Sequence, residues 1–427
     1  MKRVCVLGID CMSPRVVFGP MRQELPTLDE LLSEGHSGIL ESSFPPTTIP
    51  AWMSMFTGKD PGQLGVYGFK HRRGHAMNSP IEAVSRLDYQ AKPIWEWASR
   101  QNLESVVVGV PSSWPVASLR GAMVSDFTTP TAQRSVYPER HLRLLGEDWN
   151  WDLSNWRMSD HEATLNDLIA LSENYWRVFD ELITGFPNWS LGILVDIAMD
   201  RAHHLFWEQG IDEGEAPRRE GPLWNFYKYI DAKLESFTSK LPRDTSLLIV
   251  SDHGAQAMQG GFNLNQWLID QGLLVLNQTP EGTVKPTDVN WHQSTWWGEG
   301  GYVGKLHLSP YVGEQPQRAL DDLRARLAAE EFGNDVRVQA PHELYADVQG
   351  APPTAFIVVK ELRIRCIGSL ASDHNLWPED NDQGADAANH HPDGLFIQSG
   401  CTNELRGREA LEAVYDWIKT ELRPSDR

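Results

Sequence analysis

The sequence predicts an α/β protein with a mostly parallel sheet and helices on both faces of that sheet. Two observations support this fold class: strand-length apolar runs alternate with helix-length stretches, and several of these runs are apolar throughout. Such a pattern is typical of parallel strands that are covered on both faces. With 427 residues, 41% of them hydrophobic, the chain can form one large domain with insertions or two to three ordinary domains.

The predicted elements follow one another without an internal repeat or a low-complexity tract. Apolar runs that predict buried strands lie at residues 4–9, 104–110, 191–195, 245–250 and 394–397. Helices are expected at residues 25–35, 93–101, 223–241, 265–272, 318–331 and 406–422. The first of these helices closes on Gly35, a residue type that often ends a helix.

Two segments interrupt the alternation, residues 128–188 and residues 277–351. The first is rich in Trp and charge, and the second mixes Gly, Pro and aromatic residues. We expect both to be insertions on a single domain that spans residues 1–427, and to form a cap over its site. Some of the seventeen Trp residues would then surround a substrate, although Trp more often packs in cores.

Charge and composition restrict the classes of function. A formal net charge of −20 disfavours binding to long DNA or RNA, because nucleic-acid affinity comes largely from Lys and Arg. No stretch approaches the ~20 apolar residues of a membrane span, and the apolar run at the N-terminus is too short for a signal peptide. We therefore expect a cytoplasmic protein that does not bind membranes. The four scattered Cys residues predict buried free thiols.

Polar residues cluster where the predicted strands end, which is where ligands bind in open α/β sheets. Asp10 follows the first strand, and Asp200 and His204 follow the third. On a helix, Asp200 and His204 are four residues apart and share one face, so both can bind one metal ion, whereas His203 points elsewhere.

Two further strands carry the same kinds of residue. Asp252 and His253 follow the fourth strand on a glycine-bounded turn, and the doublet His390-His391 lies just before the fifth strand. Any one of these motifs is compatible with a surface turn, but together they predict a metal centre at one edge of the sheet. Asp and His without thiolate suit zinc, manganese or iron better than calcium. Six ligands suffice for two ions.

A candidate nucleophile lies in the segment Pro46-Thr47-Thr48-Ile49-Pro50. Pro50 is expected to be the first residue of a short helix that Gly58 ends. Thr48 then lies at the helix N-terminus, where free backbone N–H groups attract a phosphate. A metal ion can activate a threonine hydroxyl as a nucleophile. Without the metal ligands, Thr48 would be interpreted as a simple helix cap.

These motifs, in this order, resemble the type I phosphodiesterase and nucleotide pyrophosphatase branch of the alkaline phosphatase superfamily. The resemblance runs from residue 3 to about residue 400 and is weakest in the two insertions. A narrower resemblance, to a prokaryotic subgroup of predicted phosphohydrolases or phosphomutases, is carried by residues 50–62 and by Asn265-Gln266-Trp267-Leu268. The resemblance implies an alkaline-phosphatase-like fold.

The resemblance also implies roles for individual residues. Asp200, His204 and His390 would bind one divalent metal ion, and Asp10, Asp252 and His253 would bind the other. The ions would be Zn²⁺, with Mn²⁺ or iron as alternatives. Thr48 would bridge toward the second ion, attack phosphorus and form a phosphothreonine, from which activated water releases phosphate.

The sequence departs from the family pattern at one phosphate contact. Nucleotide pyrophosphatases carry an Asn shortly after the nucleophile helix, whereas this chain has Phe69 in the comparable stretch. The positive charge expected there would come from nearby cations, and Lys59 and Arg72 are candidates for binding the substrate together with Phe69. Further cations in the same stretch are Lys70, His71 and Arg73. In the last motif His391 is an alternative to His390, but the motif order favours His390.

The function predicted from the sequence is metal-dependent hydrolysis of a small soluble phosphoester, which a Trp-rich wall would suit to a nucleotide-like leaving group. A phosphotransferase or phosphomutase that uses the same phosphoenzyme is the alternative. A non-catalytic, metal-stabilised binding protein is a further alternative. The sequence argues against a sulfatase, because the residues around Thr48 lack the Cys or Ser and the Arg of that class. The sequence does not predict the oligomeric state.

Overall fold

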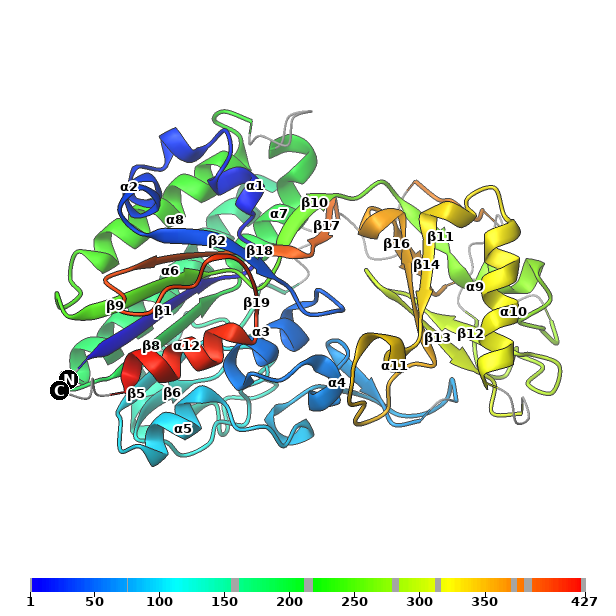
Figure 1. Ribbon diagram of the computed structural model, residues 1–427, viewed down its shortest axis with the longest axis horizontal. Coiled ribbons are helices and arrows are strands. Elements are labelled where there is room, and N and C mark those ends of the chain that lie inside the picture. The colour runs from blue at the N-terminus through cyan, green and yellow to red at the C-terminus, as the bar shows by residue number, and fades with distance from the viewer. Residues whose placement is uncertain are drawn as a thin grey trace.

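The computed structural model describes residues 2–74, 76–154, 161–210, 218–278, 284–311, 316–369, 375–379 and 386–423, and of 161–163 and 208–210 only the backbone. Figure 1 shows two lobes. The large lobe comprises residues 2–257 and 386–423, and the small lobe comprises residues 258–379. Within the described residues, no helix is long and apolar enough to cross a membrane.

A nine-stranded sheet forms the centre of the large lobe, and seven of its strands run in one direction. Only β18 and β7 run antiparallel to their neighbours. The prediction of a mostly parallel α/β sheet is therefore confirmed. In order across the sheet, the strands are β19 (Gly407–Ala410), β2 (His36–Glu41), β18 (Asp393–Ser399), β9 (Thr245–Val250), β1 (Arg3–Ile9), β8 (Leu191–Asp196), β5 (Ser105–Val108), β6 (Gly121–Val124) and β7 (Val136–Tyr137).

Alternate side chains of the sheet contribute to two separate apolar cores. On β1, Cys5 and Leu7 belong to one core, and Val4 and Val6 belong to the other. The first face is covered by α1 (Pro14–Val17), α2 (Pro26–Glu34), α6 (His161–Gly185), α7 (Ala198–Gly210) and α8 (Pro222–Thr238). The second face is covered by α3 (Thr48–Thr57), α5 (Ile94–Arg100) and α12 (Ala413–Leu422).

In the described part of residues 128–188, β7 extends the main sheet and α6 packs against β5 and β8. The apolar face of α6, with Phe179 and Leu182, belongs to the main core. The expected helix at residues 406–422 is instead β19 followed by α12, since residues 407–410 pair with the exposed edge of β2.

The small lobe contains a four-stranded antiparallel sheet in the order β12 (Trp296–Glu299), β13 (Gly304–Leu308), β15 (Ala355–Val359) and β14 (Val336–Gln339). Helices α9 (Leu264–Asp270) and α10 (Pro316–Ala329) pack with this sheet around Trp267 and Trp296. The parallel pair β11 (Gly261–Asn263) and β16 (Arg365–Ile367) lies beside them. Residues 277–351 thus belong to a lobe with its own core.

The two lobes are connected and packed against each other. The chain leaves the large lobe along β10 (Gly254–Ala257) and returns along β17 (Ala388–His391), and these strands pair antiparallel (Figure 1). From the large lobe, Tyr67 contacts Tyr345 and Phe356 of the small lobe. The remaining short elements are β3 (Lys70–Arg72), β4 (Ile81–Ala83), α4 (Pro61–Leu64) and α11 (Pro341–Leu344).

Candidate metal centre and substrate cavity

Six buried Asp and His side chains meet at one edge of the main sheet. The parallel strands β1, β8 and β9 end side by side, so the residues that follow them are brought together. The returning strand β17 adds the last histidine from the ribbon between the lobes. These residues are Asp10, Asp200, His204, Asp252, His253 and His390, and each is at most 2% exposed.

Asp200, His204 and His390 form a compact group whose ligand atoms face one another. Asp200 Oδ1 lies 3.3 Å from the Nε2 atoms of both histidines, and these two nitrogens are also 3.3 Å apart. In a tetrahedral zinc site with bonds of about 2.0–2.1 Å, neighbouring ligand atoms are about 3.3 Å apart. The group therefore has the dimensions of three corners of such a site.

Asp10, Asp252 and His253 form a second group next to the first. His253 Nε2 lies 3.2 Å from Asp252 Oδ2 and 3.8 Å from Asp10 Oδ1. The groups adjoin, because Asp200 and His253 also lie within 4.8 Å of the Cys11 thiol. Sequence reasoning missed Cys11, which immediately follows Asp10. Burial raises the pKa of its thiol well above the ordinary value, and Asp200 raises it further.

Hydrogen bonds orient all three histidine rings in the same way. The Nδ1 atom of each ring faces a backbone carbonyl: that of Ala388 for His204, that of Gly254 for His253 and that of Pro46 for His390. Because a carbonyl only accepts, each Nδ1 donates to it, and each Nε2 lies on the side of the ring that faces its group. A neutral histidine with its proton on Nδ1 can bind a metal through Nε2.

Several buried polar atoms at the site lack a hydrogen-bond partner. They are Asp10 Oδ1, Thr48 Oγ1, Asp200 Oδ1, Asp252 Oδ2 and His253 Nε2. A buried polar atom without a partner costs about 1–3 kcal/mol, and five such atoms in residues of one site require a common explanation. Two divalent cations would satisfy them, and the donor set of carboxylate and imidazole fits zinc, manganese or iron.

The acidic groups at the site also lack sufficient positive charge from the protein. Burial raises the pKa of Asp10 well above its ordinary value, and Asp252 and Asp200 raise it further. Burial likewise raises the pKa of Asp252. Burial acts in the same direction on Asp200, but His204, His390 and Arg201 together outweigh it and keep that pKa well below the ordinary value. Bound cations would relieve this repulsion.

Neighbouring histidines of each doublet point away from the site. His203 lies buried on another side of α7, where its ring contacts the Met199 carbonyl and the Tyr227 hydroxyl. His391 points to the opposite side of β17 from His390, and its Nε2 lies 3.1 Å from Arg15. The strand alternation of β17 thus places His390, and not His391, in the first group.

The nucleophile segment meets the metal centre at the start of α3. This helix begins at Thr48, two residues before the expected start at Pro50, and ends at Gly58 with a positive φ of 65°. Proline is tolerated within the first turn because the N–H groups there have no helical partner. Thr48 is fully buried, whereas Thr47 borders the cavity described next.

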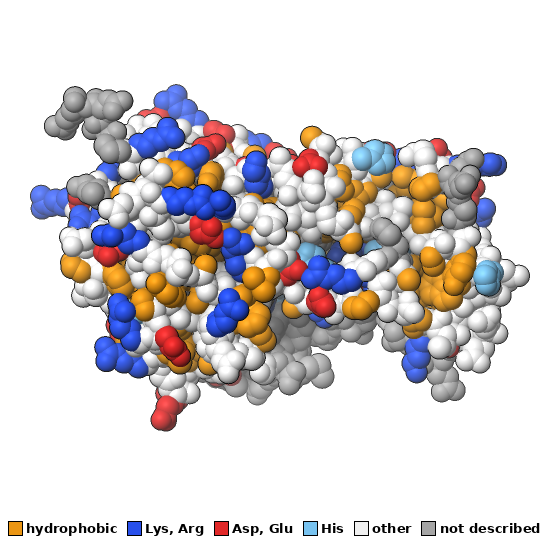
Figure 2. Space-filling model, turned by 90° about the horizontal axis from the view of Figure 1, so that it is seen from below, with side chains coloured by type: hydrophobic (Ala, Val, Ile, Leu, Met, Phe, Trp, Pro, Cys, Tyr) orange, Lys and Arg blue, Asp and Glu red, His pale blue; other side chains and the backbone are white. Residues whose placement is uncertain are grey.

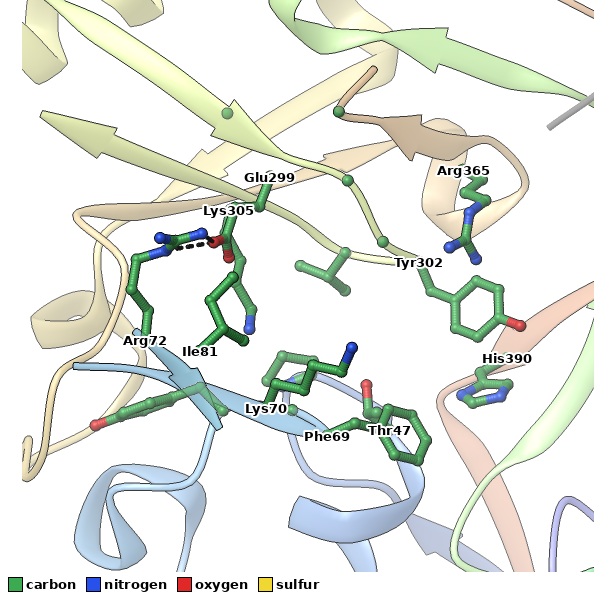
Figure 3. Close-up of a pocket in the computed structure, with 18 of the residues that line it drawn as sticks. Thr47, Phe69, Lys70, Arg72, Ile81, Glu299, Tyr302, Lys305, Arg365 and His390 are labelled. Carbon is green, nitrogen blue, oxygen red and sulfur yellow. Dashed lines mark hydrogen bonds and ion pairs between the residues drawn. The ribbon is translucent and has the colours of Figure 1, made fainter. Parts of the chain in front are cut away.

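A cavity of about 760 Å³ opens from the metal centre between the two lobes. Figure 2 shows the depression between the lobes from one side, and Figure 3 shows the side chains inside it. Of the three candidates for binding the substrate, Phe69 and Arg72 line this cavity, whereas Lys59 lies outside it. Of the Trp residues in the described chain, Trp297 alone lines it, so a Trp-rich wall is not present there.

Three further residues support the first group, and no sequence motif marks them. Asp386 Oδ1 lies 2.6 Å from His204 Nδ1 and orients that ring. Tyr302, from the loop between β12 and β13, stacks on His204 and donates to Asp386 across 3.1 Å. Arg201 holds the second oxygen of Asp200 at 2.6 Å, and its position beside a candidate ligand was its only signal.

Residues 4–379 match the family described as type I phosphodiesterase / nucleotide pyrophosphatase. No curated protein sequence matches this chain. Solved structures of the same fold include phosphonoacetate hydrolase from Sinorhizobium meliloti 1021 in complex with phosphonoformate. It has a TM-score of 0.66 and 15% sequence identity, and the match covers 99% of this chain and 96% of that chain.

Two mammalian structures have the same fold. Murine ectonucleotide pyrophosphatase / phosphodiesterase 5, as an inactive threonine-to-alanine variant in complex with AMP, has a TM-score of 0.57 and 13% identity, covering 99% of this chain and 95% of that chain. The human counterpart has a TM-score of 0.55 and 14% identity, with the same coverages. At these identities the likeness concerns the fold, and the alkaline-phosphatase-like architecture is confirmed.

Proposed function

This chain belongs to the type I phosphodiesterase and nucleotide pyrophosphatase family, and we propose that it is a two-metal phosphoester hydrolase with Thr48 as its nucleophile. The observation that carries the proposal is the pair of buried groups, Asp200/His204/His390 and Asp10/Asp252/His253, beside the N-terminus of α3. Unpartnered atoms of Asp10, Asp200, Asp252 and His253, together with the unpartnered Thr48 hydroxyl, are the parts that such a reaction needs.

The two divalent ions, Zn²⁺ or Mn²⁺, would supply charge that stabilises the attacking and leaving oxygens. The protein itself contributes the position of Thr48. Its hydroxyl lies at a helix N-terminus, whose free backbone N–H groups meet a transferring phosphoryl group. The Thr48 oxygen would form a bond to phosphorus as the bond to the leaving alcohol breaks. Water would then hydrolyse the phosphothreonine and regenerate the hydroxyl.

The charge of the cavity supports an anionic substrate. Five Lys or Arg residues line it against three Asp or Glu residues, although the whole chain has a net charge of −20. Local positive charge in an acidic protein attracts small anions and does not favour long nucleic acids. We propose a small phosphoester as substrate, and we propose that the small lobe acts as the cap that covers it.

Aromatic residues on both sides of the cavity leave room for an organic leaving group. Phe69 and Phe127 come from the large lobe, and Trp297 and Tyr302 come from the small lobe. A nucleotide-like leaving group is compatible with this lining. The mouse relative bound to AMP has the same fold at 13% identity, which supports that class without naming the substrate of this chain.

Thr48 and its neighbour Thr47 provide the sharpest test of the mechanism. Zn²⁺- or Mn²⁺-loaded protein is assayed with bis(p-nitrophenyl) phosphate and p-nitrophenyl phosphate, and acid-quenched samples are analysed for phosphopeptides. Thr48→Ala should lose turnover by roughly the factor of 10³ or more that removal of an activated nucleophile costs. Thr47→Ala should keep most of it, and the label should lie on Thr48.

The outcomes separate the alternatives. Near-normal turnover in Thr48→Ala would contradict the covalent mechanism and leave Thr48 as a helix residue only. An added acceptor alcohol that becomes phosphorylated would identify a phosphotransferase that uses the same phosphoenzyme. Absence of turnover with every ester tested, in protein that holds both metals, would contradict hydrolysis itself.

A further inference from the structure

Two lysines face the cavity away from the metal centre. Lys70 is on β3 of the large lobe, and Lys305 is on β13 of the small lobe. Both line the cavity. Figure 3 shows their ammonium groups in its interior, between the Arg72–Glu299 pair on one side and Thr47 with His390 on the other.

Other cations of the cavity are already paired. Arg72 forms an ion pair with Glu299, and Arg201 binds Asp152 at 2.8 Å as well as Asp200. Arg365 packs over the Tyr302 ring and lies 3.8 Å from Asp386.

By contrast, the ammonium groups of Lys70 and Lys305 make no hydrogen bond or ion pair with any residue that the structure describes. The negative charge that acts on Lys305 is that of Glu299. This carboxylate already forms an ion pair with Arg72, and His307 Nε2 lies 3.6 Å from its Oε2.

Lys305 is placed where a free ammonium group is costly. Burial lowers its pKa below the ordinary value, Glu299 opposes this, and Arg72 adds to it. The group also sits close to the backbone of Gly68, where an added Cβ would lie only 3.2 Å from Nζ. A partly buried ammonium with no anionic partner is unfavourable unless a ligand supplies one. The space beside it opens to the cavity that would hold the substrate.

We propose that Lys70 and Lys305 form a second anion subsite, and that the natural substrate carries a second anionic group besides its phosphoester. That group is a carboxylate or a second phosphate, since both accept hydrogen bonds from ammonium groups. The proposal rests on the proposed function, because the metal centre would hold the reacting phosphoryl group. The two lobes each provide one lysine, so the subsite is complete only when both face the same cavity.

Three ligands with the same carbon chain test the subsite: propylphosphonate, 3-phosphonopropionate and propane-1,3-diphosphonate. Their dissociation constants for Zn²⁺-loaded protein are measured by calorimetry, which does not require turnover. We expect 3-phosphonopropionate or propane-1,3-diphosphonate, which carry an anionic group at each end, to bind about tenfold more tightly than propylphosphonate. A tenfold gain in affinity corresponds to one good ionic contact. Preference between carboxylate and phosphonate identifies the second group.

Variants assign the effect to these lysines. In Lys305→Met and in Lys70→Met the ratio of dissociation constants should fall toward one. Lys92→Met, which removes an exposed lysine outside the cavity, should keep the ratio of the unaltered protein. Lys70 is itself exposed, so its variant is expected to fold even if Lys305→Met does not.

Equal dissociation constants for all three ligands would overturn the second subsite, as would a ratio that survives both lysine substitutions. The proposed function fails differently, through absence of turnover with simple esters. The two failures are therefore distinguishable in the same preparation.

Discussion

At the scale of single residues, the candidate metal ligands are distinguished by which histidine nitrogen faces the centre. His204, His253 and His390 each have Nδ1 at a backbone carbonyl, so that Nε2 faces the centre. In His203, by contrast, Nδ1 contacts the Met199 carbonyl and Nε2 contacts the Tyr227 hydroxyl, and this residue belongs to neither group of candidate ligands. The hydrogen-bond partners on the far side of each ring thus separate candidate ligands from structural histidines.

We predict that His204→Ala and His390→Ala lose a metal ion, because each removes one of three converging donors. His391→Ala should keep the metal content, since its ring contacts Arg15 outside the centre. His203→Ala should also keep it while losing stability through its contact with Tyr227. Metal content is measured by atomic emission after desalting. Loss of metal in His391→Ala with retention in His390→Ala would place the ligand one residue later.

At the scale of elements, the helix that carries Thr48 depends on how it ends. Gly58 follows α3 with φ +65°, and a Cβ there would lie 3.0 Å from the Tyr415 ring of α12. Gly272 follows α9 with a similar φ of +67°, but nothing lies within 4 Å of its added Cβ. An alanine at Gly58 or at Gly272 would therefore pay the same cost for the left-handed backbone conformation. Only the alanine at Gly58 would also clash with a neighbouring side chain.

We predict that Gly272→Ala destabilises the protein by roughly 1–2 kcal/mol, the cost of a left-handed alanine. Gly58→Ala should cost measurably more because it also pushes against Tyr415, and it should reduce turnover by shifting α3. Both free energies come from urea unfolding with equal slopes. An equal loss of stability in both variants would show that Tyr415 moves aside without cost.

At the scale of the whole molecule, the cavity is a property of two lobes together. Thr47, Phe69 and Lys70 border it from the large lobe, and Tyr302 and Lys305 border it from the small lobe. The paired strands β10 and β17 carry the chain between the lobes, and β17 also carries His390. Metal binding is therefore expected to stabilise the large lobe and the connection between the lobes at once.

We predict that chelation abolishes turnover and lowers the unfolding temperature, and that Zn²⁺ or Mn²⁺ restores both. A ligand that binds only the folded state stabilises it by about 2.7 kcal/mol for one site at a concentration of 100 Kd. Scanning calorimetry at several metal concentrations measures the shift. Asp252→Ala, which lacks one ligand of the second group, should show a smaller shift. Full turnover in metal-free protein would contradict the two-metal mechanism.

The sequence by itself determined the fold class and most strands and helices, and it predicted that Asp and His residues gather at one site. Buried parallel strands are apolar throughout, so they are visible without tertiary information. The residues after them, such as Asp10 and Asp252, could be predicted to converge because parallel strands end at one edge. Helical spacing and the motif order favoured His204 and His390 over their neighbours, and these two rings lie in one compact group with Asp200.

Tertiary structure alone decided the rest. The spacing of apolar residues in α6 predicts that the helix has an apolar face, but it does not predict which surface that face packs against. In the structure this face packs in the core of the main sheet. Residues 407–410 form a strand because they pair with the edge strand β2. Local sequence propensity does not predict such a long-range pairing. Asp386 contacts His204 and Tyr302, both far away in sequence, so no local pattern marked these residues. Lys305 lines the cavity only because the two lobes pack together. The positions of these residues follow from packing between two lobes, a long-range interaction that only the folded chain specifies.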